Sequence, residues 1–558
     1  MNISSLVCPG VPLANASLAS NFCAFQYPVT VNQARSVVSV GPGDALILER
    51  GAQAVTLLQD MDGDSVPDNK TELVTAPGLN HGLALWDSYI FASSATTVYR
   101  WSYDSYFNIT SPDPTVVVTN ISADDMGTPG QGVHTTRTLA FDSVGRLYIS
   151  VGSMTNVDYN SFRARLRRFN ISDETLYPID FLTGEVFADG LRNEVGLAFD
   201  KHGVLWGVEN GADNLNRPDL GVDIHQNNPA EELNRFPDEN AGLPYGYPYC
   251  WTEYFLPANV THGRGLGSVW AWPGSFDINY TDAQCQTDFV PPKLAMQAHS
   301  APLGITFYNW KPDSERPVNC TGGFPQEMDG YAFIAFHGSW DRTIPTGYKV
   351  VYVPMNAEGN VTSLPGQNLT DVPIDLLAHV PPNAQWESGF RPVDVDFDPC
   401  GRLVVTSDGS GSTGSMVIRI ESTATASASV PPSSVPTIAT GQPSFARSLL
   451  PVTVSPTHLV SHAPSTAFPS NASPTTGSTS TIRPSFALST EANASSNVAS
   501  TAPSITTLST APPTVSTLMP TVVNTTRTSK VTSQAGTLSR SRRSHMLLLV
   551  VIVPWLMW

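Results

Sequence analysis

Polar residues that could bind an anion or move a proton stand just before several short apolar runs of the sequence. His134 precedes the run LAFDSVGRLYISVG by five residues, and Arg192 precedes the run LAFDKHGVLWGVEN by the same number. Arginine forks bind carboxylates, and an imidazole with a pKa near neutrality can take a proton. The pattern therefore predicts a site that binds a polar, anionic ligand and carries a general base. The other residues that precede such runs are Asn80, His81, Asn193, His299, Ser300 and Arg391.

The runs themselves repeat a pattern of strand, turn and strand, in which apolar residues alternate as they do in a half-buried hairpin. A recurring antiparallel unit of this kind is typical of a radial array such as a propeller. Residues 30–421 at about 50–65 residues per blade predict an all-β, six-bladed β-propeller. Equivalent positions of the blades would then meet at one central mouth. The copies are LALWDSYIFASS from residue 83, LAFDSVGRLYISVG from 139, LAFDKHGVLWGVEN from 197 and VDFDPCGRLVVTSD from 395, with looser copies at 303 and 330.

Longer motifs around these repeats resemble those of the pyrroloquinoline quinone (PQQ)-dependent sugar dehydrogenases. The resemblance covers about residues 30–421 and is greatest to fungal pyranose dehydrogenase, with sorbosone and soluble glucose dehydrogenases as further relatives. It implies a quinone cofactor, an active-site calcium ion and a sugar substrate. The motifs are HTTRTLAFDSVGRLYISVG, GLRNEVGLAFD, GVENG, FHGSWDRTIPTGYKVV and GFRPVDVDFDP.

The same resemblance implies a role for each matching residue. His134 corresponds to the base that takes the proton of the sugar hydroxyl, and Arg192 and Asn193 correspond to the pair beside the reacting quinone carbonyl. The backbone carbonyls of Gly211 and Ala212 correspond to those that bind the active-site calcium. The residues implied to hold the carboxylates of the cofactor are Arg342, Lys349 and Arg391.

The resemblance implies oxidation of the anomeric hydroxyl of a pyranose, or of a related aldose or ketoaldehyde. The sequence contains no C-x-x-C-H haem motif, so the expected electron acceptor is external, such as a cytochrome-domain protein. Two alternatives stay open. One is a non-catalytic cell-surface propeller that binds a protein or glycan, and the other is a calcium-dependent propeller hydrolase such as a lactonase.

A second metal signal lies in the stretch DMDGDSVPD, outside the repeats. Oxygen ligands at alternate positions around Gly63 suit calcium, as in an EF-hand loop. The twelfth position holds Thr71 in place of the usual glutamate. The stretch therefore predicts a structural calcium site, with an ordinary acidic turn as the alternative. The predicted ligands are Asp60, Asp62, Asp64 and Asp68.

Sequons and cysteines indicate a secretory protein. Six cysteines are consistent with three disulfides, and pairing in sequence order is one of fifteen possibilities: Cys8–Cys23, Cys250–Cys285 and Cys320–Cys400. The chain is acidic, with a formal net charge of -18, which argues against nucleic acid as a partner. Asn-x-Ser/Thr sequons begin at Asn2, Asn15, Asn69, Asn108, Asn120, Asn170, Asn259, Asn279, Asn319, Asn360, Asn368, Asn471, Asn493 and Asn524.

The two ends of the chain differ in composition from the middle. Residues 1–29 form an N-terminal extension without the pattern of a signal peptide. Residues 422–530 are rich in Ser, Thr and Pro, which predicts a disordered, O-glycosylated stalk. Residues 531–558 place small residues, a polar spacer and a terminal apolar run in the order of a GPI-anchor signal, with a short tail anchor as the alternative. The predicted location is the extracellular face of the cell surface, with the membrane as a partner through the lipid anchor.

Overall fold

The computed structural model describes residues 11–424, apart from residues 105, 122–131, 161, 222, 258–263, 273–279, 383–384 and 411–412. The predicted stalk beyond residue 424 and the predicted anchor signal lie outside the described residues. Within the described part, none of the helices is long and apolar enough to span a bilayer.

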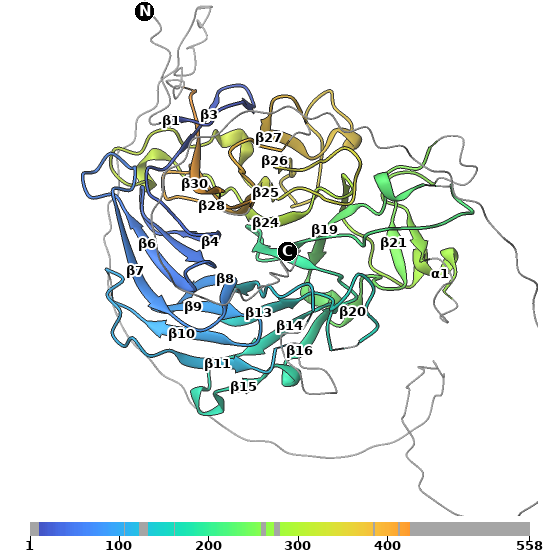
Figure 1. The fold of residues 1–558 in the computed structure, drawn as a ribbon, viewed down its shortest axis with the longest axis horizontal. Helices are drawn as coiled ribbons and strands as arrows, with labels where there is room; N and C mark the ends of the chain where they lie inside the picture. Colours follow the sequence, from blue (N-terminus) through green and yellow to red (C-terminus); the bar gives the residue numbers. More distant parts are fainter. Residues whose placement is uncertain are drawn as a thin grey trace, which may run out of the picture. The chain divides into compact units, whose positions relative to one another are not determined.

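Six antiparallel sheets are arranged around a central axis (Figure 1), which confirms the predicted all-β, six-bladed propeller. Blade 1 contains β4 (Ala34–Ser39), β5 (Ala45–Glu49), β6 (Ala54–Gln59) and β7 (Asn69–Thr75). Blade 2 contains β8 (Leu79–Trp86), β9 (Tyr89–Ser94), β10 (Val98–Ser102), β11 (Thr115–Thr119) and the short parallel strand β15 (Ile179–Asp180). Blade 3 contains β12 (Leu139–Phe141), β13 (Arg146–Val151), β14 (Arg165–Asn170), β16 (Glu185–Asp189) and β20 (Leu243–Pro244).

The second half of the ring follows the same order from the inner strand outward. Blade 4 contains β17 (Glu194–Phe199), β18 (Leu205–Glu209), β19 (Glu231–Phe236) and β23 (Leu294–Met296). Blade 5 contains β24 (Pro302–Phe307), β25 (Ala332–Phe336), β26 (Lys349–Val353), β27 (Ile374–His379) and β2 (Ala16–Leu18). Blade 6 contains β28 (Pro392–Phe397), β29 (Leu403–Ser410), β30 (Thr413–Ser422), β3 (Phe22–Gln26) and β1 (Val11–Pro12).

Strands from the N-terminal region close the ring. β3 pairs with β30 in blade 6, and β2 pairs with β27 in blade 5. Residues 11–26 therefore belong to the propeller sheets, whereas the sequence analysis placed them in a separate extension. These strands have two to five residues and lie outside the recurring hairpin motifs, so the sequence offers little to identify them. Their pairing with β27 and β30 covers edges that would otherwise be open.

The aspartate that recurs in the repeats shapes the turn between the first two strands of a blade. The Asp142 carboxylate accepts hydrogen bonds from the backbone N–H groups of Val144 and Arg146, at 3.1 and 2.9 Å. Gly145 adopts a φ of 84° between them, which favours glycine. Asp200 and Asp398 accept equivalent bonds in blades 4 and 6. The repeat is therefore a structural turn motif.

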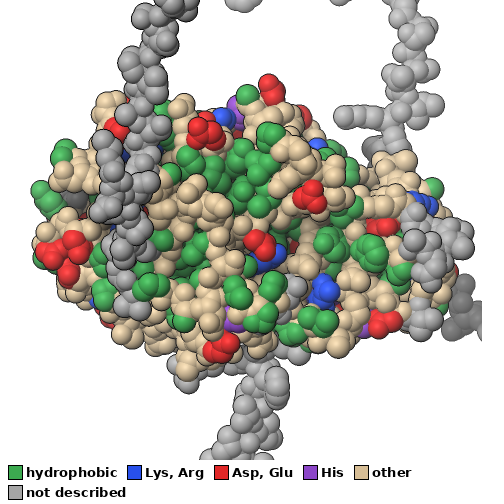
Figure 2. Space-filling model, turned by 90° about the horizontal axis from the view of Figure 1, so that it is seen from above, with side chains coloured by type: hydrophobic (Ala, Val, Ile, Leu, Met, Phe, Trp, Pro, Cys, Tyr) green, Lys and Arg blue, Asp and Glu red, His purple; other side chains and the backbone are tan. Residues whose placement is uncertain are grey.

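Two disulfides fix loops at the rim of the ring. Cys250–Cys285 joins the small hairpin of β21 (Cys250–Thr252) and β22 (Val269–Ala271) to the helix α1 (Asp282–Thr287). Cys320–Cys400 joins the loop before β25 to the turn between β28 and β29. Both predicted pairs are confirmed, while Cys8 of the third pair lies outside the described residues. On the side that Figure 2 shows, the basic side chains lie as separate small groups among acidic and uncharged ones.

Candidate active site

The residues that precede the inner strands β12, β17 and β24 gather at one end of the propeller, as the repeat phase predicted. They line a cavity with an empty volume of about 330 Å³. We call this end of the propeller the mouth. The polar side chains that line this cavity include His134, Arg192, Asp213, His299, Ser339 and Asp341.

The His134 imidazole is held in one tautomer by Ser153. Its Nδ1 lies 2.9 Å from the Ser153 carbonyl oxygen and 3.0 Å from the Ser153 hydroxyl oxygen. A carbonyl oxygen only accepts, so Nδ1 carries the proton and Nε2 keeps its lone pair. The Ser153 hydroxyl in turn donates to the carbonyl of Thr155 at 2.7 Å. Burial, and then the nearby charge of Arg192, hold the pKa of His134 well below its usual value, which keeps the ring neutral near pH 7.

Arg192 lies beside this imidazole and is the cation of the cavity. Its guanidinium forms an ion pair with Asp213 at 2.7 Å and donates to the Gly211 carbonyl oxygen at 2.7 Å. It also donates to the side chain and the carbonyl of Asn156, at 2.9 and 3.2 Å. These contacts hold a positive charge in the cavity wall. Arg192 is only 4% exposed, so its guanidinium depends on these partners.

Asn193 supports the site without lining this cavity. Its side-chain amide donates to the Asn210 Oδ1 at 3.1 Å. Gly152 lies against both Asn193 and His134. An added Cβ at Gly152 would collide with Asn193 Oδ1 and lie 2.7 Å from the Cβ of His134. Glycine at this position therefore allows the two predicted site residues to approach each other.

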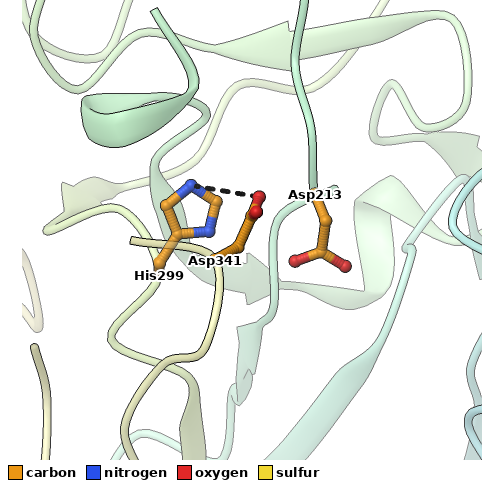
Figure 3. A group of neighbouring side chains, drawn as sticks. All are labelled: Asp213, His299 and Asp341. Carbon is orange, nitrogen blue, oxygen red and sulfur yellow. Dashed lines mark ion pairs between the residues drawn. The ribbon is translucent and has the colours of Figure 1, made fainter. Parts of the chain in front are cut away.

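Asp213, His299 and Asp341 form a compact group of potential metal ligands (Figure 3). One ligand atom from each lies within 4.8 Å of the others. His299 Nε2 lies 4.0 Å from Asp341 Oδ2 and donates to the His225 carbonyl at 2.6 Å, so Nδ1 keeps its lone pair. The repeat phase predicts His299 near the mouth but does not predict the two aspartates as ligands. Their only signal was their position inside the motifs GVENGAD and HGSWD.

The predicted carbonyl ligands lie next to this group. The Gly211 carbonyl already accepts from Arg192 and has a second lone pair, and Ala212 is buried in the same loop. Two carboxylates within reach of this loop supply the oxygen ligands that calcium prefers. The donor set therefore fits a hard divalent cation. Nearby, burial raises the pKa of Glu231 to about 8, and its carboxylate accepts from the Gly211 N–H at 2.7 Å.

Arg391 lies at the mouth but lines a different cavity, with an empty volume of about 530 Å³. Its guanidinium donates to the carbonyl oxygens of His337 and Gly338, at 3.2 and 3.1 Å. Its Cζ lies 5.6 Å from the centre of the Tyr348 ring. The structure thus places Arg391 against the backbone of the HGSW segment.

A group of basic residues near Arg391 was not found by sequence reasoning. Asp408 forms ion pairs with Arg35 at 2.8 Å and with Arg50 at 3.4 Å, and it contacts His337 Nε2 at 2.8 Å. Burial and then Arg391 lower the pKa of His337 to about 4. The imidazole is therefore neutral near pH 7, and two arginines pair with one carboxylate close to Arg391. This part of the mouth is suited to an anionic ligand.

Neither of the other two predicted cofactor-binding residues is among those that line the cavity of His134. Arg342 donates to the Ala298 carbonyl at 3.4 Å, next to His299, and to Asn227 Oδ1 at 3.2 Å in the turn between β18 and β19. Lys349 begins β26, the third strand of blade 5, and pairs with Asp375 of β27 at 2.6 Å. The cofactor-binding roles of Arg342 and Lys349 stay predictions.

The acidic loop between β6 and β7 partly matches the predicted structural calcium site. Ligand atoms of Asp60, Asp62 and Asp68 lie within 4.8 Å of one another. Asp64 does not join this group, and its carboxylate accepts from the Val66 N–H at 2.7 Å. The calcium site therefore stays a prediction, with three of the four expected ligands brought together.

Known proteins are similar to this chain in sequence and in fold. The TrAA12-like family model matches residues 16–419. A PQQ-dependent sugar dehydrogenase of Hypocrea jecorina is 34% identical over 400 residues, which cover 68% of this chain and 83% of that protein. A PQQ-dependent pyranose dehydrogenase of Coprinopsis cinerea is 30% identical over 433 residues, covering 72% of this chain and 55% of the relative.

A solved structure gives the same result. The holo form of the PQQ domain of the Coprinopsis cinerea pyranose dehydrogenase has a TM-score of 0.61 and 27% identity, and covers 74% of this chain and 99% of that one. The resemblance predicted from the motifs is confirmed. The chain belongs to the TrAA12-like family.

Proposed function

We propose that this protein is an extracellular PQQ- and calcium-dependent dehydrogenase of a pyranose or a related aldose or ketoaldehyde, which passes electrons to an external acceptor. The observation that carries the proposal is the free Nε2 of His134 in the same cavity as Arg192. The names of its relatives supply the cofactor and the substrate class.

The chain's own residues account for the movement of the proton. The lone pair on His134 Nε2 takes the proton of the sugar hydroxyl, while the Nδ1–H bond to Ser153 keeps the ring oriented. Arg192 supplies a fixed positive charge that stabilises negative charge developing in the cavity. When bound, the quinone supplies the acceptor for the hydride that leaves the sugar carbon.

Buried polar atoms around the mouth fit an additional polar ligand. The Ser339 hydroxyl, which lines the cavity, and the Arg342 Nε are buried without a hydrogen-bond partner among the described residues. Buried polar groups normally have partners. Arg391 lines a cavity of its own next to the pair that Arg35 and Arg50 form with Asp408, and its guanidinium is suited to a carboxylate of PQQ.

The calcium ion of the proposal would be held by side chains as well as by the backbone. Asp213, Asp341 and His299 Nδ1 offer ligands beside the Gly211 and Ala212 carbonyls. A bound calcium ion supplies Lewis-acid polarisation of an oxygen in the cavity. It would also balance the two aspartates, which otherwise oppose an anionic cofactor.

A cell-surface location is consistent with the direction of the strands. Inner strands begin at the mouth, so third strands such as β30 end at the opposite face. Ser422, the last residue of β30, donates to the Gly322 carbonyl in the loop between β24 and β25, at 2.8 Å. A stalk and lipid anchor that continue from this end would leave the mouth accessible to sugar and acceptor.

The test is a titration of the purified protein with PQQ, with and without calcium, followed by a panel of sugars and a redox dye. Expression should begin upstream of Val11, because β1–β3 complete two blades. Calcium-dependent PQQ binding followed by sugar-dependent dye reduction is expected. Folded protein that fails to bind PQQ would overturn the proposal and favour the binding-protein alternative.

A further inference from the structure

Three glutamates lie side by side in blade 4, one on each of three neighbouring strands. Glu194 of β17 is directly opposite Glu209 of β18, and Glu209 is directly opposite Glu232 of β19. Glu194 and Glu209 are 3% and 6% exposed. Like charges opposite one another destabilise a sheet, and burying them without compensation costs more. This arrangement therefore needs compensation, either by protons on the carboxylates or by a bound cation.

The side chain of Asn234 lies at the centre of the three carboxylates. Its Nδ2 is 3.2 Å from Glu194 Oε2, 3.2 Å from Glu209 Oε2 and 3.5 Å from Glu232 Oε2. An amide nitrogen has two hydrogens, so it cannot satisfy three carboxylates. The fully buried Asn234 Oδ1 and the Glu194 Oε1 have no hydrogen-bond partner among the described residues. The cluster thus contains two unpartnered oxygen atoms, one from an amide and one from a carboxyl group.

The surrounding sheet leaves room for the cluster. Gly207 lies opposite Asn234, and an added Cβ there would collide with Glu194 Oε1. Glycine within a strand usually weakens the strand. Gly207 is needed here because the Glu194 carboxylate occupies the space that a side chain would take.

A similar glutamate elsewhere in the propeller has its own cation. Glu49 ends the second strand of blade 1, as Glu209 ends the second strand of blade 4. Glu49 is paired with Lys70 Nζ at 2.8 Å and accepts from the Thr56 hydroxyl at 2.8 Å. Within the part of the chain that the structure describes, no lysine or arginine forms an ion pair with the blade 4 glutamates. Blade 4 therefore lacks the cation that blade 1 supplies from its own sequence.

We propose that Glu194, Glu209, Glu232 and Asn234 form a second divalent-cation site, suited to calcium. Carboxylate and amide oxygens are the ligands that calcium takes, at about 2.3–2.6 Å. Rotating the Asn234 amide by half a turn places Oδ1 where Nδ2 lies, and the orientation of an amide is assigned rather than observed. Modest movement of the carboxylates toward the ion would then complete the site.

The proposed site is separate from the mouth but adjoins it. A cavity with an empty volume of about 430 Å³ is lined by Glu209, Glu232 and Thr252 on one side and by Arg192 and Gly211 on the other. The Arg192 backbone N–H donates to Glu209 Oε1. A cation here would therefore hold the backbone of Arg192 in place through Glu209. Its presence does not depend on the proposed dehydrogenase activity.

Terbium luminescence and calcium-dependent stability test the proposal directly. Trp251 and Trp272 line the same cavity, so Tb³⁺ bound at the glutamates should emit when tryptophan is excited. Calcium should displace it, and calcium should raise the melting temperature of the purified protein relative to EDTA. The variant Glu194→Gln should weaken calcium binding at this site by more than about tenfold and remove most of this emission.

Matched variants separate this site from the other two acidic groups. Glu49→Gln removes a buried glutamate that has its own lysine and should leave Tb³⁺ emission unchanged. Asp60→Asn and Asp213→Asn address the surface loop and the mouth, and each should leave the blade 4 signal intact. Should Glu194→Gln not fold, Glu232→Gln at the edge of the cavity replaces it. The proposal is overturned if wild-type protein gives no sensitised emission, or if both glutamate variants bind calcium as wild type does, because protons would then balance the cluster.

Discussion

His134 donates its Nδ1 proton to the backbone carbonyl of Ser153, at 2.9 Å, so its Nε2 remains a proton acceptor within the cavity of Arg192. Ser153 comes two residues after the end of β13, and His134 precedes β12 of the same blade. The bond therefore joins the two strand ends that meet at the mouth. Two strands of one blade thus fix the base in a single tautomer.

Replacing this base should separate catalysis from cofactor binding. His134→Gln is expected to lower sugar-dependent dye reduction by about 10²–10⁴-fold, the usual contribution of a general base. PQQ affinity should change little, because the arginines near Asp408 are untouched. Steady-state rates and a PQQ titration measure the two effects. His202→Gln, an exposed position in a blade 4 turn, is the control, and near wild-type activity of His134→Gln would assign the base elsewhere.

Removing one carboxylate of the mouth should weaken calcium binding there. Asp341→Asn is nearly the same size and keeps one oxygen ligand, so the fold should persist. We expect a rise of more than about tenfold in the calcium Kd of the mouth, because a hard cation depends on ligand charge. Isothermal titration measures it. Asp375→Asn, which removes only the half-exposed partner of Lys349, should leave calcium binding unchanged.

Several features of this site were predictable because they follow the blade repeat. His134, Arg192 and His299 occupy matching positions before inner strands, and the propeller brings these positions to one mouth. The repeat also places an acidic residue near the mouth end of three second strands, which is a further pattern in the sequence. These residues are Glu49, Glu209 and Asp408. The strand that carries Lys349 was not predictable in this way, because nearness to a motif in sequence does not tell which strand of a blade will carry a residue.

Other features depend on contacts between distant parts of the chain. The ion pair of Arg35 with Asp408 joins blade 1 to blade 6, and the two residues are 373 positions apart in the sequence. The pairing of β3 with β30 is also of this kind. Neither is visible in local periodicity, because each depends on how the ring closes.

The contribution of His337 to the stability of the propeller should fall as the pH falls from about 6.5 to about 4. Burial lowers the pKa of His337 to about 4, whereas an unfolded histidine titrates near 6.5. Between these values this histidine binds more protons in the unfolded chain than in the folded one, so acid weakens its contribution to folding. Burial raises the pKa of Asp394 to about 6 and that of Asp396 to about 7, and these two groups act in the opposite direction. Asp408, whose pKa is also lowered in the folded state, adds a further loss below about pH 4. Urea unfolding between pH 7.5 and 4.5 measures the slope.

The contribution of His337 can be isolated with one substitution. His337→Gln keeps a polar side chain beside Asp408 but does not titrate, so the slope of stability against pH should differ from that of the wild type by about one proton. His81 and His134 contribute in the same direction as His337, and Asp394 and Asp396 in the opposite one, so the difference between wild type and variant isolates His337. An unchanged slope would show that His337 is not buried in its neutral form.

The sequons should carry glycans mainly on the face opposite the mouth. Inner strands begin at the mouth, so the turns after first and third strands lie at the far face, where added sugar cannot block the cavity. Peptide mapping of secreted protein by mass spectrometry should find glycans there, and enzymatic deglycosylation should leave sugar oxidation unchanged. Asn120, at the opposite end of β11, and Asn15, which precedes β2 beside the last residue of β27, are the informative exceptions within the described part. The asparagines in far-face turns are Asn69, Asn108, Asn170, Asn319, Asn360 and Asn368. Unmodified asparagines at all six positions would contradict both the secretory location and the orientation proposed for the mouth.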